Sequence, residues 1–439
     1  MGNIKSRFFD HIEKNKYLTF VSTLAKWILW GCIIGVATGS ATALLKKIIK
    51  YLTDTREAQP LLLFLLPAGG IVIGFLYKYI GKESDKGNNL ILDNIHNGQG
   101  TVPLRMGPIV YIASFITHLF GGSTGREAAA VQMGASISEA VNRIFKIGKI
   151  DRMILLMSGI SGGFGSAFSA PMTGTIFGME VVAIGQTKYE ALVPCLVASF
   201  AGHFTAKAWG VPIEKHTIHS VPNVTAEIMF KVIVASIIFG FISVLYSQLR
   251  HRIEKLSKKY LKNPMLIGMV GGLLIIALTY LVGSRDYTGR GLKTVSQAFD
   301  GEVPPFAFLA KLVFTAVTMG MGFRGGEAIP LFFVGATLGN TLAPIAGLQP
   351  SFLAAIGLIT VFSGAANAPI SCFLLGIEMF EGKAIIFFFV ASLVSYLFSG
   401  HHGIYPSQKL YKPKSRLLNL PEGETIAAIE QKKNERERS

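Results

Sequence analysis

Arg126 and Glu127 interrupt hydrophobic sequence beside a cluster of glycines, and their types and position could support ion chemistry. They lie in the stretch G-G-S-T-G-R-E-A-A-A-V-Q-M-G-A-S at residues 121–136. A charged side chain at bilayer depth costs at least about 2.5 to 3.5 kcal/mol, so it is tolerated only toward a protein interior or a water-filled path. The glycines predict a break in a helix, and the small residues after them predict a new helix whose free N–H groups form an anion site. Glu127 is itself an anion at that place, so we expect it to compete with a bound anion and to leave when protonated.

A structural ion pair is the alternative for these two residues. Arg126 and Glu127 would then pair with each other or with neighbours inside a helix bundle, because buried ion pairs also occur without a functional role. The rest of the chain is needed to choose between the two interpretations.

The composition is that of a polytopic membrane protein. Half of the 439 residues are hydrophobic and only 15% are charged, and the mean hydropathy is +0.47, which favours an all-α membrane fold over a set of soluble domains. The formal net charge of +16 would suggest a nucleic-acid partner in a soluble protein. Here the basic residues cluster between apolar runs, so we attribute the charge to the positive-inside bias and expect no nucleic acid as partner.

The cysteines show no sign of a metal site. Cys32, Cys195 and Cys372 all lie within apolar runs and lack metal-ligand spacing. We expect them to be inert core residues, and we expect the protein to need no metal and no other cofactor.

Apolar segments follow one another along most of the chain, and several are too short or too interrupted by Gly and Pro to be clean membrane spans. Such interrupted segments predict discontinuous helices that meet near the middle of the bilayer. We expect the basic loops at residues 143–152 and 250–262 and both termini to be cytoplasmic. The predicted organisation is an N-terminus at 1–16, a first membrane repeat at 17–210, a connection at 211–226, a second repeat at 227–405 and a charged, partly disordered tail at 406–439.

An internal repeat supports two related halves. The segment G-R-E-A-A-A-V-Q-M-G-A-S from Gly125 parallels G-E-A-I-P-L-F-F-V-G-A-T from Gly326 at an offset of 201 residues. A second pair, residues 163–180 and 361–378, shares an A-P dipeptide and a terminal G-x-E at an offset of 198. Two nearly equal offsets in the same order predict duplicated halves with a site between them, although the residues alone leave parallel and inverted repeats both open.

These motifs resemble the CLC family of anion channels and proton-coupled anion antiporters. The resemblance covers nearly the whole chain and rests on G-R-E at 125–127, G-E-A-I-P at 326–330 and G-H-H-G-I-Y ending at Tyr405. It implies two inverted repeats of tilted and re-entrant helices, a homodimer with one ion pathway per subunit, and no enzymatic activity.

The resemblance also points to one branch, the fluoride/proton antiporters. Asn88 stands where chloride-handling members have a serine, Glu327 is a second carboxylate, and Val181 stands where chloride/proton exchangers have a proton-relay glutamate. Fluoride is strongly hydrated, so its desolvation needs strong donors such as the Asn88 amide and helix-start N–H groups. Glu127 and Glu327 are expected to gate and transfer protons. The expected anion-binding positions are Asn88, Gly125, Arg126, Ala128, Ala328, Ile329 and Tyr405.

Other interpretations remain open at several positions. Asn88 could cap a loop, Glu327 could pair with Arg324, and Tyr405 could be an aromatic residue at the lipid interface. Ala128, Ala129 and Ile329 depart from the usual family pattern, which leaves a chloride/proton antiporter or chloride channel as the alternative function.

An intramembrane serine protease is a more remote alternative. Residues 159–163 read G-I-S-G-G, which matches a nucleophile elbow around Ser161. An elbow needs a strand before it, and none is expected there. The family resemblance thus implies a proton-coupled fluoride exporter in the plasma membrane, with fluoride, protons, the lipid bilayer and a second copy of the chain as its partners.

Overall fold

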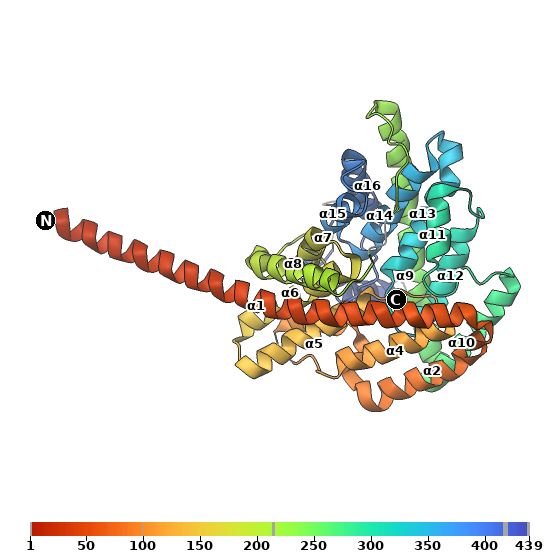
Figure 1. Cartoon of the computed structure of the whole chain (residues 1–439), viewed down its shortest axis with the longest axis horizontal. Coiled ribbons are helices and arrows are strands. Elements are labelled where there is room, and N and C mark those ends of the chain that lie inside the picture. Colours follow the sequence, from red (N-terminus) through yellow and green to blue (C-terminus); the bar gives the residue numbers. More distant parts are fainter. Residues whose placement is uncertain (1, 99, 213–215, 416–419, 437–439) are drawn as a thin grey trace.

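The structure, a computed structural model, describes residues 2–98, 100–212, 216–415 and 420–436, and it is almost entirely helical (Figure 1). The first half contains α1 (Gly2–Ala58), α2 (Leu66–Phe75), α3 (Asn88–Asn97), α4 (Met106–Phe120), α5 (Glu127–Phe145), α6 (Lys149–Phe168), α7 (Pro171–Glu180) and α8 (Leu192–Ala208). Short helical turns, η1 (Pro60–Leu65), η2 (Leu76–Gly81), η3 (Lys82–Lys86) and η4 (Tyr189–Ala191), connect some of them.

The second half repeats this helical pattern. It contains α9 (Ala226–Tyr260), α10 (Pro264–Val282), α11 (Leu292–Asp300), α12 (Ala307–Gly320), α13 (Ala328–Ala346), α14 (Pro350–Ala366), α15 (Pro369–Met379) and α16 (Ile385–Phe398). Within the described ranges, six stretches are long and apolar enough to cross a membrane, and five more apolar helices are shorter. The mixture of long and short helices is the one expected from the interrupted apolar segments.

Glycines let equivalent helices approach closely in both halves. A Cβ on Gly134 of α5 would lie 2.1 Å from the carbonyl oxygen of Gly159 on α6. The equivalent Gly335 of α13 would place a Cβ 2.0 Å from the oxygen of Gly357 on α14. Backbones pack this tightly only where both residues are small, so the repeated glycines preserve one helix crossing in each half.

Two glutamates join the halves reciprocally. Glu180 at the end of α7 accepts hydrogen bonds from the Ile370 and Ser371 N–H groups at the start of α15, at 3.0 and 2.7 Å. Glu378 near the end of α15 accepts from the Met172 and Thr173 N–H groups at the start of α7, both at 2.8 Å. Each carboxylate satisfies free helix-start donors of the other half, which stabilises the interface between the halves.

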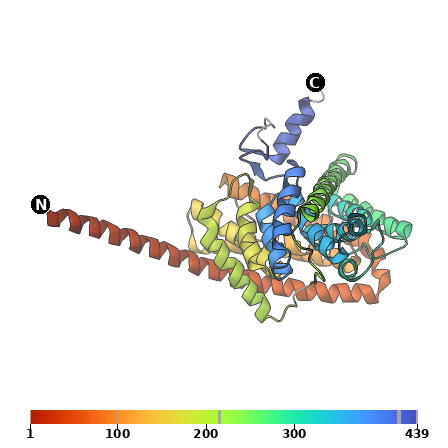
Figure 2. The same ribbon diagram turned by 90° about the horizontal axis from the view of Figure 1, so that it is seen from above.

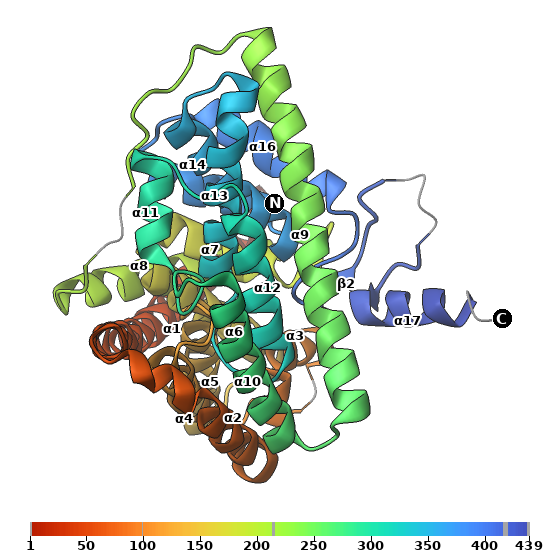
Figure 3. The same cartoon turned by 90° about the vertical axis from the view of Figure 1, so that its right-hand side faces the viewer.

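The tail forms regular structure, and the expectation of a partly disordered tail is wrong for its described residues. β2 (Lys409–Leu410) pairs in parallel with β1 (Ala183–Ile184) and antiparallel with β3 (Glu424–Thr425). The last helix, α17 (Ile426–Arg436), follows β3 and lies outside the bundle, beyond α9 (Figures 2 and 3). Ile184, Leu410 and Ile426 form a small buried cluster beneath it. Residues 416–419 and 437–439 of the predicted tail lie outside the described residues.

Two smaller expectations have different outcomes. Cys195 and Cys372 are buried as expected, but Cys32 is exposed on α1, so the prediction that all three are core residues is wrong for Cys32. α1 extends over residues 2–58, and its N-terminal part projects from the bundle (Figures 1 and 2). Ser161 lies in the middle of α6, with no strand leading into it, so it does not form a nucleophile elbow.

Candidate anion and proton site

The site is built where the two repeats touch. Gly125 and Gly326 form an isolated antiparallel bridge, in which each N–H donates to the other carbonyl oxygen at 2.7 Å. The Thr124 hydroxyl also donates to the Gly326 oxygen at 2.9 Å. Each helix begins two residues after its glycine, α5 at Glu127 and α13 at Ala328. The bridge therefore brings two helix starts, with their free N–H groups, to one place.

The Glu127 side chain occupies this place. Its Oε1 accepts a hydrogen bond from the Ala328 N–H at 2.5 Å, and the residue is 3% exposed. A Cβ on Gly326 would lie 1.9 Å from Oε1, and a Cβ on Gly125 would lie 2.3 Å from Oε2. The carboxylate thus fills a cradle that exists only because both residues are glycine. It stands where a free anion would be stabilised by the start of α13.

A small cavity, which we call the Arg126 cavity, is lined by Arg126, the residue that precedes Glu127. Its volume is about 30 Å³, and its lining includes Arg126, Phe168, Ile329 and Phe332. Arg126 and Ile329 are both buried. The cavity combines a cationic side chain with apolar walls, a setting in which an anion is attracted and loses much of its water.

A second, smaller cavity, the Asn88 cavity, is lined by Val131, one turn after Glu127 on α5. Its volume is about 10 Å³, and its lining includes Asn88, Val181 and Tyr405. A volume of about 10 to 15 Å³ on this measure holds one water molecule. The Asn88 cavity is therefore about the size of one water molecule or of an ion of similar radius.

The alternative roles of Asn88 and Tyr405 do not fit their positions. Asn88 is the first residue of α3, no side-chain hydrogen bond caps that helix, and its Oδ1 is buried without a hydrogen-bond partner among the described residues. Tyr405 is only 9% exposed, so it is not an aromatic residue at a lipid interface. Both side chains face the same interior cavity.

Glu327 does not pair with Arg324, the alternative considered from the sequence. Arg324 pairs instead with Asp85, to which it donates from both guanidinium Nη atoms. Glu327 accepts from the Tyr246 hydroxyl at 2.7 Å and lies 3.4 Å from Nε of Arg250. Both partners come from α9, in the same half of the chain but far from Glu327 in sequence.

The structure therefore brings most of the predicted positions together. Gly125, Glu127 and Ala328 meet at the bridge, Arg126 and Ile329 line one cavity, and Asn88 and Tyr405 line the other. Ala128 is half-buried in the first turn of α5 and lines neither cavity.

Tyr246 and Arg250 were missed by the sequence analysis. The sequence carries a signal for them, because a tyrosine and an arginine four residues apart share one face of a helix. That signal does not identify the partner, since Glu327 is distant along the chain.

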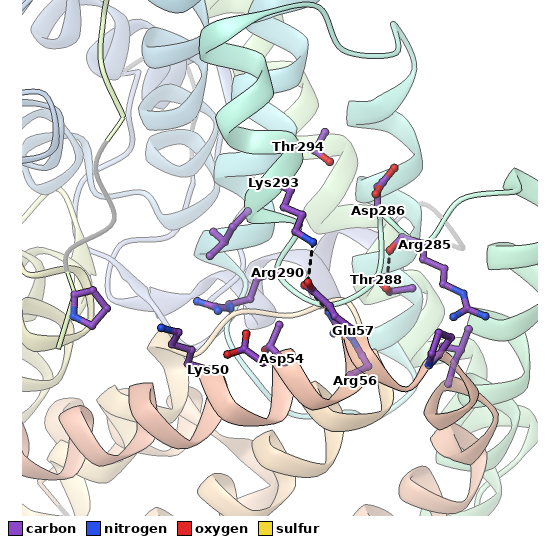
Figure 4. A pocket seen from close by; sticks show the side chains of 16 residues that line it. Lys50, Asp54, Arg56, Glu57, Arg285, Asp286, Thr288, Arg290, Lys293 and Thr294 are labelled. Carbon is purple, nitrogen blue, oxygen red and sulfur yellow. Dashed lines mark hydrogen bonds and ion pairs between the residues drawn. The ribbon is translucent and has the colours of Figure 1, made fainter.

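A larger hollow opens next to the Arg126 cavity. It has a volume of about 560 Å³, and Leu292 at the start of α11 lines both spaces. Figure 4 shows charged side chains from α1, from the α10–α11 loop and from α11 around it. Lys293 donates to Glu57 across it at 2.8 Å. Basic side chains outnumber acidic ones in the lining, namely Lys50, Arg56, Arg285, Arg290 and Lys293 against Asp54, Glu57 and Asp286, which favours the approach of anions.

Comparison with known proteins finds similarity to anion channels and anion exchangers along most of the chain. Residues 69–400 match the family described as voltage gated chloride channel. A "Chloride/fluoride channel protein" of Pseudomonas syringae pv. tomato is 39% identical over 425 residues, which cover 95% of this chain and 94% of that protein. An "H(+)/Cl(-) exchange transporter ClcA" of Vibrio parahaemolyticus is 24% identical and covers 94% of this chain and 97% of its own.

Solved structures show the same fold. A CLC-type fluoride/proton antiporter superposes with a TM-score of 0.85 at 32% identity, covering 88% of this chain and 98% of that one. A slow cyanobacterial Cl⁻/H⁺ antiporter gives a TM-score of 0.75 at 18% identity, covering 93% and 97%, and this likeness concerns the fold alone.

Proposed function

Because the chain belongs to the voltage-gated chloride channel (CLC) family of ion-transporting membrane proteins, we propose that it is a fluoride/proton antiporter that expels fluoride in exchange for protons. It acts as a transporter rather than an enzyme. The observation that carries this proposal is the Glu127 carboxylate held in the glycine cradle and bonded to the Ala328 N–H.

The cradle explains how one carboxylate can couple two ions. Ionised Glu127 fills the anion position and competes with a free anion for the start of α13. Protonation removes the negative charge, so the hydrogen bond from Ala328 weakens and the side chain leaves with its proton. An anion then takes the same N–H group. Proton and anion therefore occupy the position in turn, which is the requirement for exchange.

The two cavities give the anion a place on either side of this gate. Arg126 and Ile329 provide the first, and the Asn88 amide and Tyr405 hydroxyl provide donors in the second. Gly125 and Ala128 flank Arg126 and the gating residue Glu127 in the sequence. Glu327 supplies the second titratable carboxylate where Val181 cannot.

Fluoride is favoured over other halides by the Asn88 cavity. Its small volume and its amide and hydroxyl donors suit a small, strongly hydrated anion, because such an ion needs strong hydrogen bonds to replace its water. The relative from Pseudomonas syringae and the fluoride/proton antiporter structure support the same substrate.

Chloride exchange is the second candidate. Ile329 favours it, because a bulky apolar side chain in the Arg126 cavity gives fluoride no hydrogen bond. The exchange transporter from Vibrio parahaemolyticus is a more distant relative with that named activity.

We propose the plasma membrane as the location and the homodimer as the assembly. Basic residues crowd the α5–α6 connection and the C-terminal end of α9. The positive-inside bias therefore places these parts and both termini in the cytoplasm. The large hollow of Figure 4 then opens to the outside.

Ion efflux from liposomes tests the proposal. Purified protein is reconstituted in vesicles loaded with fluoride or chloride, and both ion electrodes and a pH electrode record release. Fluoride release should exceed chloride release by at least about tenfold, with proton movement that Glu127→Gln abolishes. Glu190→Gln removes an exposed carboxylate and should behave as wild type. Chloride release equal to or above fluoride release would support the second candidate instead.

A further inference from the structure

α9 carries a line of ionisable side chains that leads away from Glu327. Tyr246, Arg250, Glu254 and Lys258 follow one another at intervals of four residues. Residues at this spacing lie on one face of a helix, one above the other. The face runs from the middle of α9 toward its C-terminal end, which lies on the cytoplasmic side in the proposed topology.

From Arg250 onward, consecutive members of this line are in contact. Arg250 approaches Glu327 with Nε at 3.4 Å and Glu254 with Nη2 at 3.6 Å. Lys258 donates to Glu254 at 2.7 Å. The exposed fraction of the side chains rises steadily along the line, from 10% for Glu327 and 14% for Arg250 to 32% for Glu254 and 60% for Lys258. The line therefore connects the buried carboxylate to the surface.

Two carboxylates, Glu327 and Glu254, share the single guanidinium of Arg250. Because both carboxylates interact with the same guanidinium, their protonation is coupled. Lys258 and Arg324 add further positive charge beside Glu254. A proton that moves from one to the other leaves the total charge around Arg250 unchanged. Arg250 itself cannot carry the proton, because a guanidinium does not deprotonate in proteins.

The Asn88 cavity is lined by no carboxylate that could exchange protons with Glu327. Val181 contributes a methyl surface there, and Tyr405 is the only titratable side chain among the residues that line it. Protons and anions thus need different paths on this side of Glu127. The α9 line provides the second path, ending at Glu327, whose neighbour Ala328 holds the Glu127 carboxylate.

We propose that Glu254 is the carboxylate that exchanges protons between Glu327 and the cytoplasmic solution, with Arg250 and Tyr246 as positioning residues. This rests on the proposed function. Protonated Glu254 gives up its O–H proton through a bridging water, and the Glu327 carboxylate takes up a proton from that water. Glu254 is left ionised beside Arg250 and is protonated again by solvent.

Other charges surround Glu254. On α9 it faces Arg250, His251 and Lys258, and Arg324, in the segment before α13, also interacts with it electrostatically. These groups make the setting of Glu254 mainly cationic, which favours its ionised form, so Glu254 readily passes on a proton that it has taken up.

Three replacements of Glu254 test this role in the liposome assay. In Glu254→Gln, proton movement that accompanies fluoride should fall at least tenfold, because an amide cannot take up a proton. Glu254→Asp should restore most of it. In Glu254→His, coupled transport should depend on the internal pH around 6.5, where an unperturbed imidazole titrates. The control Glu227→Gln removes an exposed carboxylate at the other end of α9, and it should leave coupling intact.

Either of two results would overturn the proposal. Wild-type proton coupling in Glu254→Gln would exclude Glu254 from the path. Equal losses in Glu254→Gln and Glu254→Asp, with no new pH dependence in Glu254→His, would show a purely structural role. Failure of the proposed function is distinct, because wild-type protein would then show no fluoride-coupled proton movement in the same vesicles.

Discussion

Gly125 and Gly326 donate a hydrogen bond to each other at 2.7 Å in both directions, and this reciprocal bridge lies where the two repeats meet. The residues that follow are equivalent by the offset of 201, yet they differ in charge. Arg126 corresponds to Glu327, and Glu127 corresponds to Ala328. The repeat thus supplies two equivalent helix starts. Only the first carries the gating carboxylate, Glu127, and the N–H group of Ala328 at the second helix start binds it.

The Gly326→Ala substitution should remove Glu127 from its position. A Cβ there would overlap the carboxylate, at 1.9 Å from Oε1, so the side chain has to move out of the cradle. We expect proton coupling to fall at least tenfold while fluoride still passes, measured by paired ion and pH electrodes. Gly148→Ala is the matched control, because a Cβ at Gly148 meets no atom within 4 Å. Unchanged coupling in Gly326→Ala would argue against the cradle as the gate.

Substitution of Asn88 by serine should reduce selectivity. The shorter side chain withdraws an amide donor and enlarges the Asn88 cavity, so a larger anion is accommodated and fluoride loses a hydrogen bond. We expect the ratio of fluoride to chloride efflux to fall about tenfold. A ratio equal to that of wild type would place selectivity elsewhere, with Ile329 the next residue to change.

Glu180→Gln should destabilise the interface between the repeats. The substitution replaces one acceptor oxygen by an NH₂ group that faces the N–H donors at the start of α15. Hydrogen bonds to charged groups are worth about 1.5 to 3 kcal/mol each, so we expect a loss of about 3 kcal/mol in unfolding free energy. Glu378→Gln removes the equivalent bonds on the other side and should also lower the unfolding midpoint in detergent. Unfolding midpoints unchanged in both variants would show that these hydrogen bonds between carboxylates and helix-start N–H groups contribute little to stability.

Docking of α17 should depend on pH through Glu430. Its carboxylate accepts a hydrogen bond from Nδ1 of His402 at 3.2 Å, and this bond lowers the pKa of Glu430 below its usual range. A carboxyl with a lowered pKa stabilises the folded state above its ordinary pKa of about 4.3, and that contribution is lost as the pH falls through the lowered pKa. At pH 7, proteolysis should therefore release α17 faster from Glu430→Gln than from wild type.

The same proteolysis at lower pH provides the comparison. At a pH low enough to protonate wild-type Glu430, the two proteins should be cut at similar rates, because neither then carries a negative charge at this position. Glu435→Gln, an exposed residue on the same helix, should match wild type throughout. A difference between Glu430→Gln and wild type that persists at low pH would contradict an ionic contribution from Glu430.

The repeat and the gate could be predicted from the sequence because they are written in short local motifs. The G-R-E and G-E-A-I-P segments gave both helix starts, and the offsets paired the halves. The inverted arrangement followed only from the family resemblance. In the structure, the antiparallel bridge at Gly125 and Gly326 is consistent with it.

Long-range side-chain contacts could not be predicted. The nearest cation in sequence to Glu327 is Arg324, yet Arg324 pairs with Asp85 and leaves Glu327 to Arg250. The order of the tail was missed for a similar reason. Its high charge suggested disorder, but its fold depends on a few residues, such as Leu410, that pair with β1 of the first half.

The most direct measurement is whether a fluoride gradient drives protons against their own gradient. Vesicles holding wild-type protein and internal fluoride are placed in fluoride-free medium at equal pH, with the membrane potential clamped at zero, and internal pH is followed. Outward fluoride movement should acidify the interior in wild type and in Glu190→Gln, and it should leave the internal pH unchanged in Glu127→Gln. Fluoride loss from wild-type vesicles without any acidification would contradict proton-coupled exchange and would indicate a channel.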